Sequence, residues 1–274
     1  MKHFRKIFYV VDPTTEHQQG LGRVIDGAHS LETQLHLQVC VPPSTLSTAD
    51  REKLREVEAH RYRLWLEHLA EPARKLGVDV TVGVDVSDDW RAAIVESARR
   101  EGAELIVKTV LPRSRLQRRL QKTSDWVLLR SSPCPVLFIK NDEVQIPKTL
   151  VAAVDIRNLE GEGKALAEAV LFHARGIAES TGAMLQVVHA YPDQMHFVYP
   201  SDLAQFAGTD ISHVCAKEDS PEHLLTEVLA EVADPVVVIG STPKRSFGGK
   251  VLGNTAERIL DRVSSDILVV MNPA

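Results

Sequence analysis

The sequence predicts an α/β protein with two tandem doubly wound domains, each built on a five-stranded parallel sheet. Short, β-branched apolar runs alternate with segments of helical periodicity, the order typical of parallel sheets covered on both faces. The order occurs twice, because Val107-Lys108 aligns with Ile239-Gly240, and Val136-Leu137 aligns with Ile267-Leu268. In the second copy, a loop that contains glycines joins a strand to a helix.

The first half accounts for one domain. An apolar run follows Lys6, as expected of a first strand, and a helix with its apolar residues on one face comes next. A long charged helix then ends before Gly77, since glycine often follows a helix end. We expect Ser87 to cap the next helix, with Asp88 and Asp89 in the first turn, where the helix dipole favours acids. The expected strands are 6–11, 35–41, 78–84, 105–107 and 135–139, and the expected helices include 20–33, 50–75 and 124–129.

The second half repeats this order and gives the second domain. A run that ends at Asp155 matches the first strand, which ends at Asp12. Ser220 followed by Pro221 is a typical helix start, with serine as the cap and proline at the first helical position. The polar stretch 141–147 holds a proline and serves as the linker, so we expect domains at 1–142 and 148–274. The expected strands are 148–154, 184–190, 236–239 and 267–270.

The two copies differ in two places. Three side chains of the first copy obstruct a loop that would bind phosphate through backbone N–H groups, so we expect no nucleotide there. They are Lys108, Leu111 and Lys122, which stand roughly where Gly240, Pro243 and Gly253 stand in the second copy. The second copy lacks the long charged helix, because the stretch from Tyr191 to Asp210 has room only for a loop and one or two helical turns.

Composition excludes several classes of protein. The chain has 274 residues, 44% hydrophobic and 25% charged, as in soluble globular proteins. Its net charge of −5 argues against nucleic-acid binding, and no apolar run approaches the roughly 20 residues that cross a bilayer. Cys40, Cys134 and Cys215 lie far apart in the sequence and predict neither a disulfide framework nor a metal site. This cysteine usage favours a cytoplasmic protein.

One stretch of the second copy predicts an anion site. An apolar strand ending at Ile239 leads into a loop, and the helix that follows has its apolar residues on one face. Gly240 permits a sharp exit from the strand. Gly253 permits close approach to the helix start, where free N–H groups attract anions. A tight turn without a ligand remains an equal interpretation, since a glycine loop alone is weak evidence.

This stretch resembles the nucleotide loop of the universal stress protein family. The sequence pattern of that loop is Gly-x-x-Gly, followed after nine residues by Gly-Ser or Gly-Thr. The corresponding residues are Gly240, Pro243, Gly253 and Asn254, two of which depart from the pattern. The segments Leu252–Glu257 and Asp125–Arg130 resemble tandem members of the family, and the resemblance covers nearly the whole chain. It implies Rossmann-like domains of the universal stress protein fold, a role in the stress response and no enzymatic activity.

The resemblance also implies an ATP site in the second domain only, with Mg²⁺ if ATP binds. Asp155 would hydrogen-bond the adenosine end of the ligand, and His189 and Ala190 would line the adenine pocket. The residues expected to meet the phosphates are Gly240, Ser241, Gly253, Asn254 and Thr255. The residues alone leave other interpretations open, in which Asp155 caps a loop and His189 is a hydrogen-bonded packing residue.

Three functions remain open at this point. The chain is a stress protein that binds a small ligand such as ATP, a nucleotide-free ligand- or protein-binding module, or an adenine-nucleotide-using enzyme, for which no catalytic residues stand out. In the family the fifth strands pair, which implies that 136–139 meets 267–270 within this chain and leaves a further homodimer open. The alternative is two separate domains joined by the linker. One basic helical face is either solvated or a site for an anionic ligand or an acidic partner. It comprises Arg115, Arg118, Arg119 and Lys122.

Overall fold

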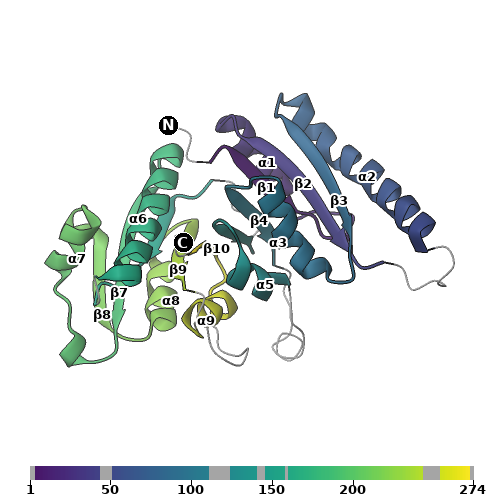
Figure 1. Ribbon diagram of the computed structural model, residues 1–274. Coiled ribbons are helices and arrows are strands. Elements are labelled where there is room, and N and C mark those ends of the chain that lie inside the picture. The colour runs from purple at the N-terminus through teal and green to yellow at the C-terminus, as the bar shows by residue number, and fades with distance from the viewer. Residues whose placement is uncertain are drawn as a thin grey trace. The chain divides into compact units, whose positions relative to one another are not determined.

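The computed structural model describes residues 4–43, 51–110, 124–140, 146–157, 160–242 and 254–271 (Figure 1). The chain divides into two compact units, Met1–Asp142 and Glu143–Ala274. Each unit has the α/β fold that the sequence predicts, with five parallel strands and helices packed against them.

The first unit contains a sheet in the order β3-β2-β1-β4-β5, with every neighbouring pair parallel. Its elements are β1 (Lys6–Val10), α1 (Leu21–Ser30), β2 (Gln34–Val41), α2 (Arg51–Lys75), β3 (Val80–Val86), α3 (Trp90–Arg100), β4 (Leu105–Thr109), α5 (Ser124–Ser131) and β5 (Val136–Ile139). The expected cap of α3 was wrong, because Asp89 and not Ser87 accepts a hydrogen bond from the N–H of Ala92, at 3.1 Å. Ser87 instead continues the sheet, since its N–H donates to the carbonyl of Val41.

The second unit contains a sheet in the order β8-β7-β6-β9-β10, again parallel throughout. Its elements are β6 (Thr149–Ala153), α6 (Gly161–Thr181), β7 (Met184–Tyr191), η1 (Gln194–His196), α7 (Pro200–Ala207), η2 (Ile211–His213), β8 (Val214–Glu218), α8 (Pro221–Glu231), β9 (Pro235–Ser241), α9 (Asn254–Arg262) and β10 (Asp266–Met271). The predicted cap Ser220 is confirmed, since its hydroxyl accepts from the N–H of His223. The eight-residue α7 stands where the first unit has the 25-residue α2, which confirms the predicted shortening.

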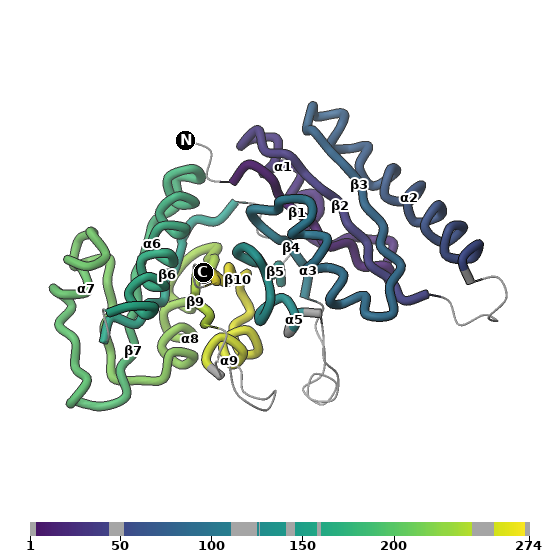
Figure 2. The backbone as a smooth tube through the Cα atoms, viewed as in Figure 1, coloured from purple at the N-terminus to yellow at the C-terminus, as the bar shows by residue number. Residues whose placement is uncertain are grey.

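The strand order of each unit reverses beside its first strand. From β6 the chain continues to β7 and then to β8 at the edge of the sheet, and it returns to β9 on the other side of β6. Figure 2 labels β6, β7 and β9, and Figure 1 labels β8. Right-handed crossovers in the two directions place helices on opposite faces of a sheet. In the first unit α1 accordingly contacts α2, while α3 contacts α5. Ligands of such folds bind at the carboxyl ends of the strands at this reversal, which in the second unit lies between β6 and β9.

Helix α6 extends further than its counterpart α1. It has 21 residues, whereas α1 has ten. The two helices end alike, because the carbonyl of Ala28 accepts from the N–H of Thr33, as that of Ala178 accepts from Ala183. The additional turns of α6 therefore lie at its N-terminal end, over the carboxyl ends of β6 and β9.

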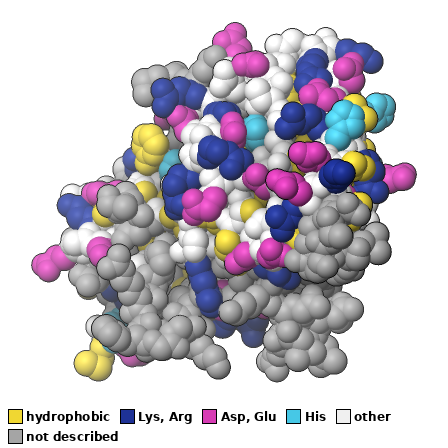
Figure 3. Space-filling model, turned by 45° about the vertical axis from the view of Figure 1, so that its right-hand side comes forward, with side chains coloured by type: hydrophobic (Ala, Val, Ile, Leu, Met, Phe, Trp, Pro, Cys, Tyr) yellow, Lys and Arg dark blue, Asp and Glu magenta, His cyan; other side chains and the backbone are white. Residues whose placement is uncertain are grey.

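Aliphatic side chains make up most of both cores, and the first core also buries Phe8, Tyr9 and Phe138 completely. Val151, Val237 and Leu268 of the second sheet are at most 1% exposed. On the face shown in Figure 3, basic and acidic side chains are interspersed and do not form a field of one sign. Within the described ranges, no helix is both long and apolar enough to span a membrane.

Candidate functional site

A cavity of about 580 Å³ lies at the carboxyl ends of β6 and β9, where the strand order of the second unit reverses. Six elements of this unit form its wall, β6, α6, β7, α8, β9 and α9, together with residues that directly follow β6 and β9. The lining residues are Ala153, Val154, Asp155, Arg157, Gly163, Leu166, Ala167, Val170, Val188, Ala190, Pro221, Leu224, Ile239, Gly240, Ser241, Thr242, Thr255, Ala256 and Ile259. The fold thus places the cavity where a doubly wound sheet binds its ligand.

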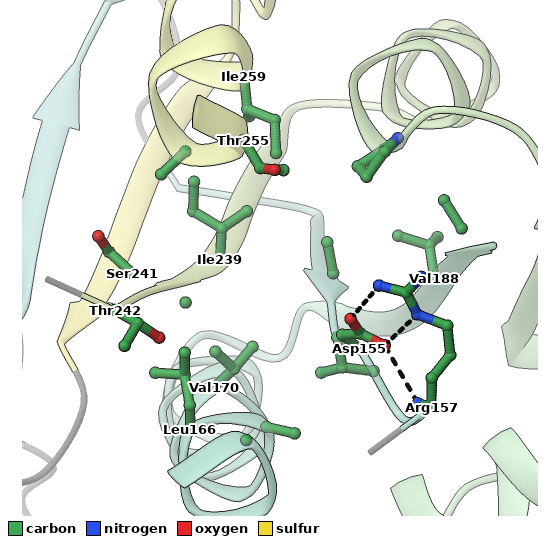
Figure 4. Close-up of a pocket in the computed structure, with 18 of the residues that line it drawn as sticks. Asp155, Arg157, Leu166, Val170, Val188, Ile239, Ser241, Thr242, Thr255 and Ile259 are labelled. Atoms are coloured by element: carbon green, nitrogen blue, oxygen red, sulfur yellow. Dashed lines mark hydrogen bonds and ion pairs between the residues drawn. The ribbon is translucent and has the colours of Figure 1, made fainter. Parts of the chain in front are cut away.

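The cavity has an apolar middle and two polar ends (Figure 4). Leu166 and Val170 of α6 and Ile239 of β9 form part of the middle. Asp155 and Arg157 lie at one end, and Ser241 and Thr242 lie at the other, with Thr255 above them on α9. An apolar body with few convergent polar groups is typical of small-molecule sites.

Asp155 forms an ion pair with Arg157 at its end of the cavity. Its Oδ2 accepts from Nη2 at 2.5 Å, and its Oδ1 accepts from Nε at 2.8 Å and from the backbone N–H of Arg157 at 3.1 Å. Burial on its own would raise the pKa of Asp155, but the hydrogen bonds and charge of Arg157 outweigh it and hold that pKa below its ordinary value. The carboxylate is therefore ionised near neutral pH, and both of its oxygens are already engaged.

Gly240 is required by a close approach between β9 and α6. A Cβ atom at this position would lie 2.6 Å from Cγ of Leu166. Leu166 belongs to the additional N-terminal turns of α6, so this glycine admits the helix as well as leaving the strand end open. The signal that the sequence offers for a ligand loop is therefore also a packing signal.

The start of α9 contributes Thr255 to the polar end of the cavity that also contains Ser241 and Thr242. Thr255 lines the cavity, and its Oγ1 lies 3.4 Å from Nη2 of Arg258. Arg258 in turn donates from Nε to the buried Glu222 of α8, at 2.8 Å. This chain of contacts fixes the first turn of α9 against α8. Gly253, the side chain of Asn254, Pro243 and the basic residues between Arg115 and Lys122 lie outside what the structure describes.

His189 does not reach the cavity. Successive side chains of a strand point to opposite faces, and its neighbours Val188 and Ala190 are the ones that line the cavity. The ring is 1% exposed, and its Nδ1 donates to the carbonyl of Val154 at 3.0 Å. Among the described residues its Nε2 has no hydrogen-bond partner. His189 therefore holds the end of β6 from below and is a packing residue.

The buried His189 should make folding depend on pH. Burial lowers its pKa below the ordinary value of about 6.5. Below a pH equal to that ordinary value, the unfolded chain therefore binds more protons at His189 than the folded protein does. The stability that the neutral, buried ring allows is fully present above this pH and is lost as the pH falls through the lower pKa of the folded protein. We expect the urea midpoint followed by circular dichroism to fall from pH 7.5 to pH 5.5, and to fall less in His189→Gln. Equal losses in the two proteins would show that His189 titrates as it does in the unfolded chain.

The ladders of the two sheets allow a residue-by-residue comparison of the units. Lys108 of β4 corresponds to Ile239 of β9, and Thr109 corresponds to Gly240, one residue away from the alignment expected of the sequence. Two strand pairings establish this alignment: Val10 pairs with Lys108, and Ala153 pairs with Ile239. Val10 and Ala153 are equivalent, because the residue after each, Val11 or Val154, donates its N–H to the neighbouring strand.

An ion pair occupies the corresponding place in the first unit. Nζ of Lys108 lies 2.6 Å from Oδ1 of Asp125, and the two side chains are 16% and 17% exposed. Asp125 of α5 corresponds to Ala256 of α9. Each lies three residues before the residue, Leu128 or Ile259, whose carbonyl accepts the last N–H at the end of its helix. Two residues that line the cavity in the second unit are thus a lysine and an aspartate in the first.

The loop after β1 is also closed upon itself. Asp12 accepts hydrogen bonds from the N–H and the hydroxyl of Thr14, at 2.9 and 2.6 Å. Gln18 bonds to the backbone N–H and carbonyl of Asp12. The hydroxyls of Tyr9 and Thr109 both donate to the carbonyl of Gln19. Asp12 therefore organises its own loop, as a capping acid does.

Sequence reasoning placed five residues on the cavity wall and missed others. Asp155, Ala190, Gly240, Ser241 and Thr255 line the cavity. Arg157 was missed, although the spacing Asp-x-Arg at a strand end is a signal for a local ion pair. The apolar wall of α6 was also missed, because an amphipathic helix shows its apolar face without showing which part of it remains uncovered.

One further group of side chains has metal-ligand geometry. Ligand atoms of Asp219, His223 and Glu227 lie within 4.8 Å of one another at the start of α8. Lys217 pairs with Glu227 and lies 3.9 Å from Asp219. The lysine thus offsets part of the negative charge of the two carboxylates.

Comparison with known proteins gives a consistent result. Residues 3–140 match the model of the Universal stress protein family. The chain is 22% identical to the Universal stress protein E homolog of Haemophilus influenzae, over 97% of this chain and 96% of that protein. It is similar in structure to the functionally unknown protein PA1789 of Pseudomonas aeruginosa, with a TM-score of 0.78, 26% identity, and coverage of 99% of this chain and 94% of the other. A universal stress protein of Archaeoglobus fulgidus has the same fold, with a TM-score of 0.74, 16% identity, and coverage of 97% and 96%.

Proposed function

Because the chain belongs to the universal stress protein family, we propose that it is a cytoplasmic stress-response protein that binds a small ligand, an adenine nucleotide, in the cavity of its second unit. The observation that carries the proposal is the cavity at the strand reversal, with its apolar middle and its polar ends. Its volume lies within the range of sites for small molecules.

The cavity suits the parts of a nucleotide. The apolar wall formed by α6 and Ile239 would contact the base, while Ser241, Thr242 and the start of α9 would donate to the phosphates. Mg²⁺ carried with ATP would be held mainly by the phosphates. The carboxylate that lines the cavity, that of Asp155, is already paired with Arg157 and so is not available as a metal ligand. We expect micromolar or weaker binding, about 8 kcal/mol or less, since the cavity is open to water at its end.

A single lining residue provides the test. Ala190→Leu adds three carbon atoms to the cavity wall and should weaken the binding of ATP with Mg²⁺ by about tenfold or more, since 1.4 kcal/mol is a factor of ten. Isothermal calorimetry measures this. Ala230→Leu, which adds the same atoms to an exposed position of α8, should bind as the wild type does. Absence of heat in the wild type would exclude ATP, and equal binding by Ala190→Leu would place the ligand elsewhere.

A second candidate function is a protein-binding module without nucleotide. The segment that replaces the long helix exposes Met195, Phe197 and Tyr199, at 93%, 43% and 63%. Phe197 and Tyr199 contact each other with ring centroids 4.8 Å apart. Exposed apolar groups of this kind are typical of interaction surfaces. This function gains support if calorimetry detects no nucleotide.

A further inference from the structure

The ion pair of Asp155 and Arg157 forms part of the cavity wall itself. Both carboxylate oxygens accept from the guanidinium, and one also accepts from the backbone of Arg157. These three hydrogen bonds use most of the roughly four acceptor sites that a carboxylate offers. The end of the cavity beyond β6 thus presents a guanidinium together with a carboxylate whose acceptor sites are mostly in use (Figure 4).

A nucleoside needs those same acceptor sites. Its hydroxyl and amino groups are donors, and Asp155 is the carboxylate among the described residues that line the cavity. Arg157 also lines the cavity, so its side chain takes space that a nucleoside would fill. Ligand and arginine cannot both engage Asp155 in the same way.

We propose that Arg157 is an affinity-determining residue that competes with the ligand for Asp155, so that the nucleoside end of the cavity opens when the guanidinium leaves the carboxylate. This rests on the proposed function, since it concerns the same cavity. It adds that the affinity depends on a residue of the chain itself, because in the free protein Arg157 donates to the same carboxylate, Asp155, to which the nucleoside would donate.

The pair is suited to be reversible. The side chain of Asp155 is 57% exposed and that of Arg157 is 37% exposed, so solvent screens their attraction. Arg157 also has a second acid within electrostatic reach. Besides Asp155, which acts more strongly, Asp193 raises the pKa of Arg157. A guanidinium displaced from Asp155 therefore has another carboxylate to approach.

Adenosine is the probe that separates competition from simple charge attraction, because it carries no net charge. We expect Arg157→Ala to bind adenosine about fivefold more tightly than the wild type, the gain expected from removing a partly exposed ion pair. Raising the salt concentration should tighten binding to the wild type, by screening the pair, and should leave Arg157→Ala unchanged. Lys164→Ala, which removes one positive charge from α6 outside the cavity, should behave as the wild type does.

The outcomes distinguish this proposal from the proposed function. If both proteins bind adenosine and Arg157→Ala binds it no more tightly than the wild type, Arg157 does not compete for Asp155, and the proposed nucleotide site is unaffected. Absence of binding of adenosine and ATP in all three proteins overturns both. Carboxyl NMR gives a readout that needs no ligand, since the pKa of Asp155 should rise in Arg157→Ala. An unchanged titration would show that the pair does not form in solution.

Discussion

Replacing Asp125 by alanine is expected to lower the free energy of unfolding of the first unit by about 2 kcal/mol. The change leaves the ammonium of Lys108, which is 16% exposed, without its carboxylate. Loss of one partner of a fully buried pair costs about 3–5 kcal/mol, and water that reaches this pair reduces the cost. The effect is larger than that of most surface changes, which lie within about 0.5 kcal/mol.

Tryptophan fluorescence during urea unfolding measures this loss in the correct unit, because all three tryptophans, Trp65, Trp90 and Trp126, belong to the first half of the chain. The double variant Lys108→Ile with Asp125→Ala is the control. It installs the residue types that the second unit has at these places, and replacing an ion pair by apolar groups is often neutral or stabilising. If the double variant is no more stable than Asp125→Ala, the loss does not come from an unpaired lysine.

The reverse exchange should abolish nucleotide binding. Ile239→Lys with Ala256→Asp builds the ion pair of the first unit into the second, at two residues that line the cavity. The longer side chains would occupy the cavity and place a carboxylate beside the phosphates. We expect the affinity for ATP to fall by at least about a hundredfold, equivalent to nearly 3 kcal/mol.

The two single variants show whether the pair or one charge is responsible. Ala256→Asp alone should weaken ATP binding by repulsion, whereas Ile239→Lys alone should lower stability, because Ile239 is 2% exposed and the lysine would be unpaired. Calorimetry measures binding, and circular dichroism measures the melting temperature. A double variant that melts as the wild type does and still binds ATP would show that the nucleotide lies away from Ile239 and Ala256.

The fold could be predicted because its signals are local and occur twice. The alternation of apolar runs with helical segments gave the five strands of the first unit and four of the five in the second, where β8 was not located. Ser220 with Pro221 gave the start of α8. Glycine signals gave two residues of the cavity wall, Gly240 and its neighbour Ser241. Each of these features depends on residues adjacent in the sequence.

The remainder depends on contacts that the sequence does not show. The side of the sheet to which His189 points follows from the register of β7, and a shift of one residue reverses it. Lys108 was aligned one residue away from its true counterpart for the same reason. The cap of α3 moved to Asp89 because β3 continues to Val86 and uses Ser87 for pairing. Sheet register thus limited the prediction of the site.

The contact of Gly240 with Leu166 also constrains the order in which mutations can accumulate. A side chain at position 240 would meet the side chain of Leu166, which must then shift, so it is tolerated better once position 166 is smaller or α6 lacks its first turns. The first unit illustrates the second route, since its α1 is eleven residues shorter and Thr109 stands in the place of Gly240. The effect of a substitution at one position thus depends on the residue at the other. A library that varies positions 166 and 240 together should yield folded proteins that neither position yields when varied alone.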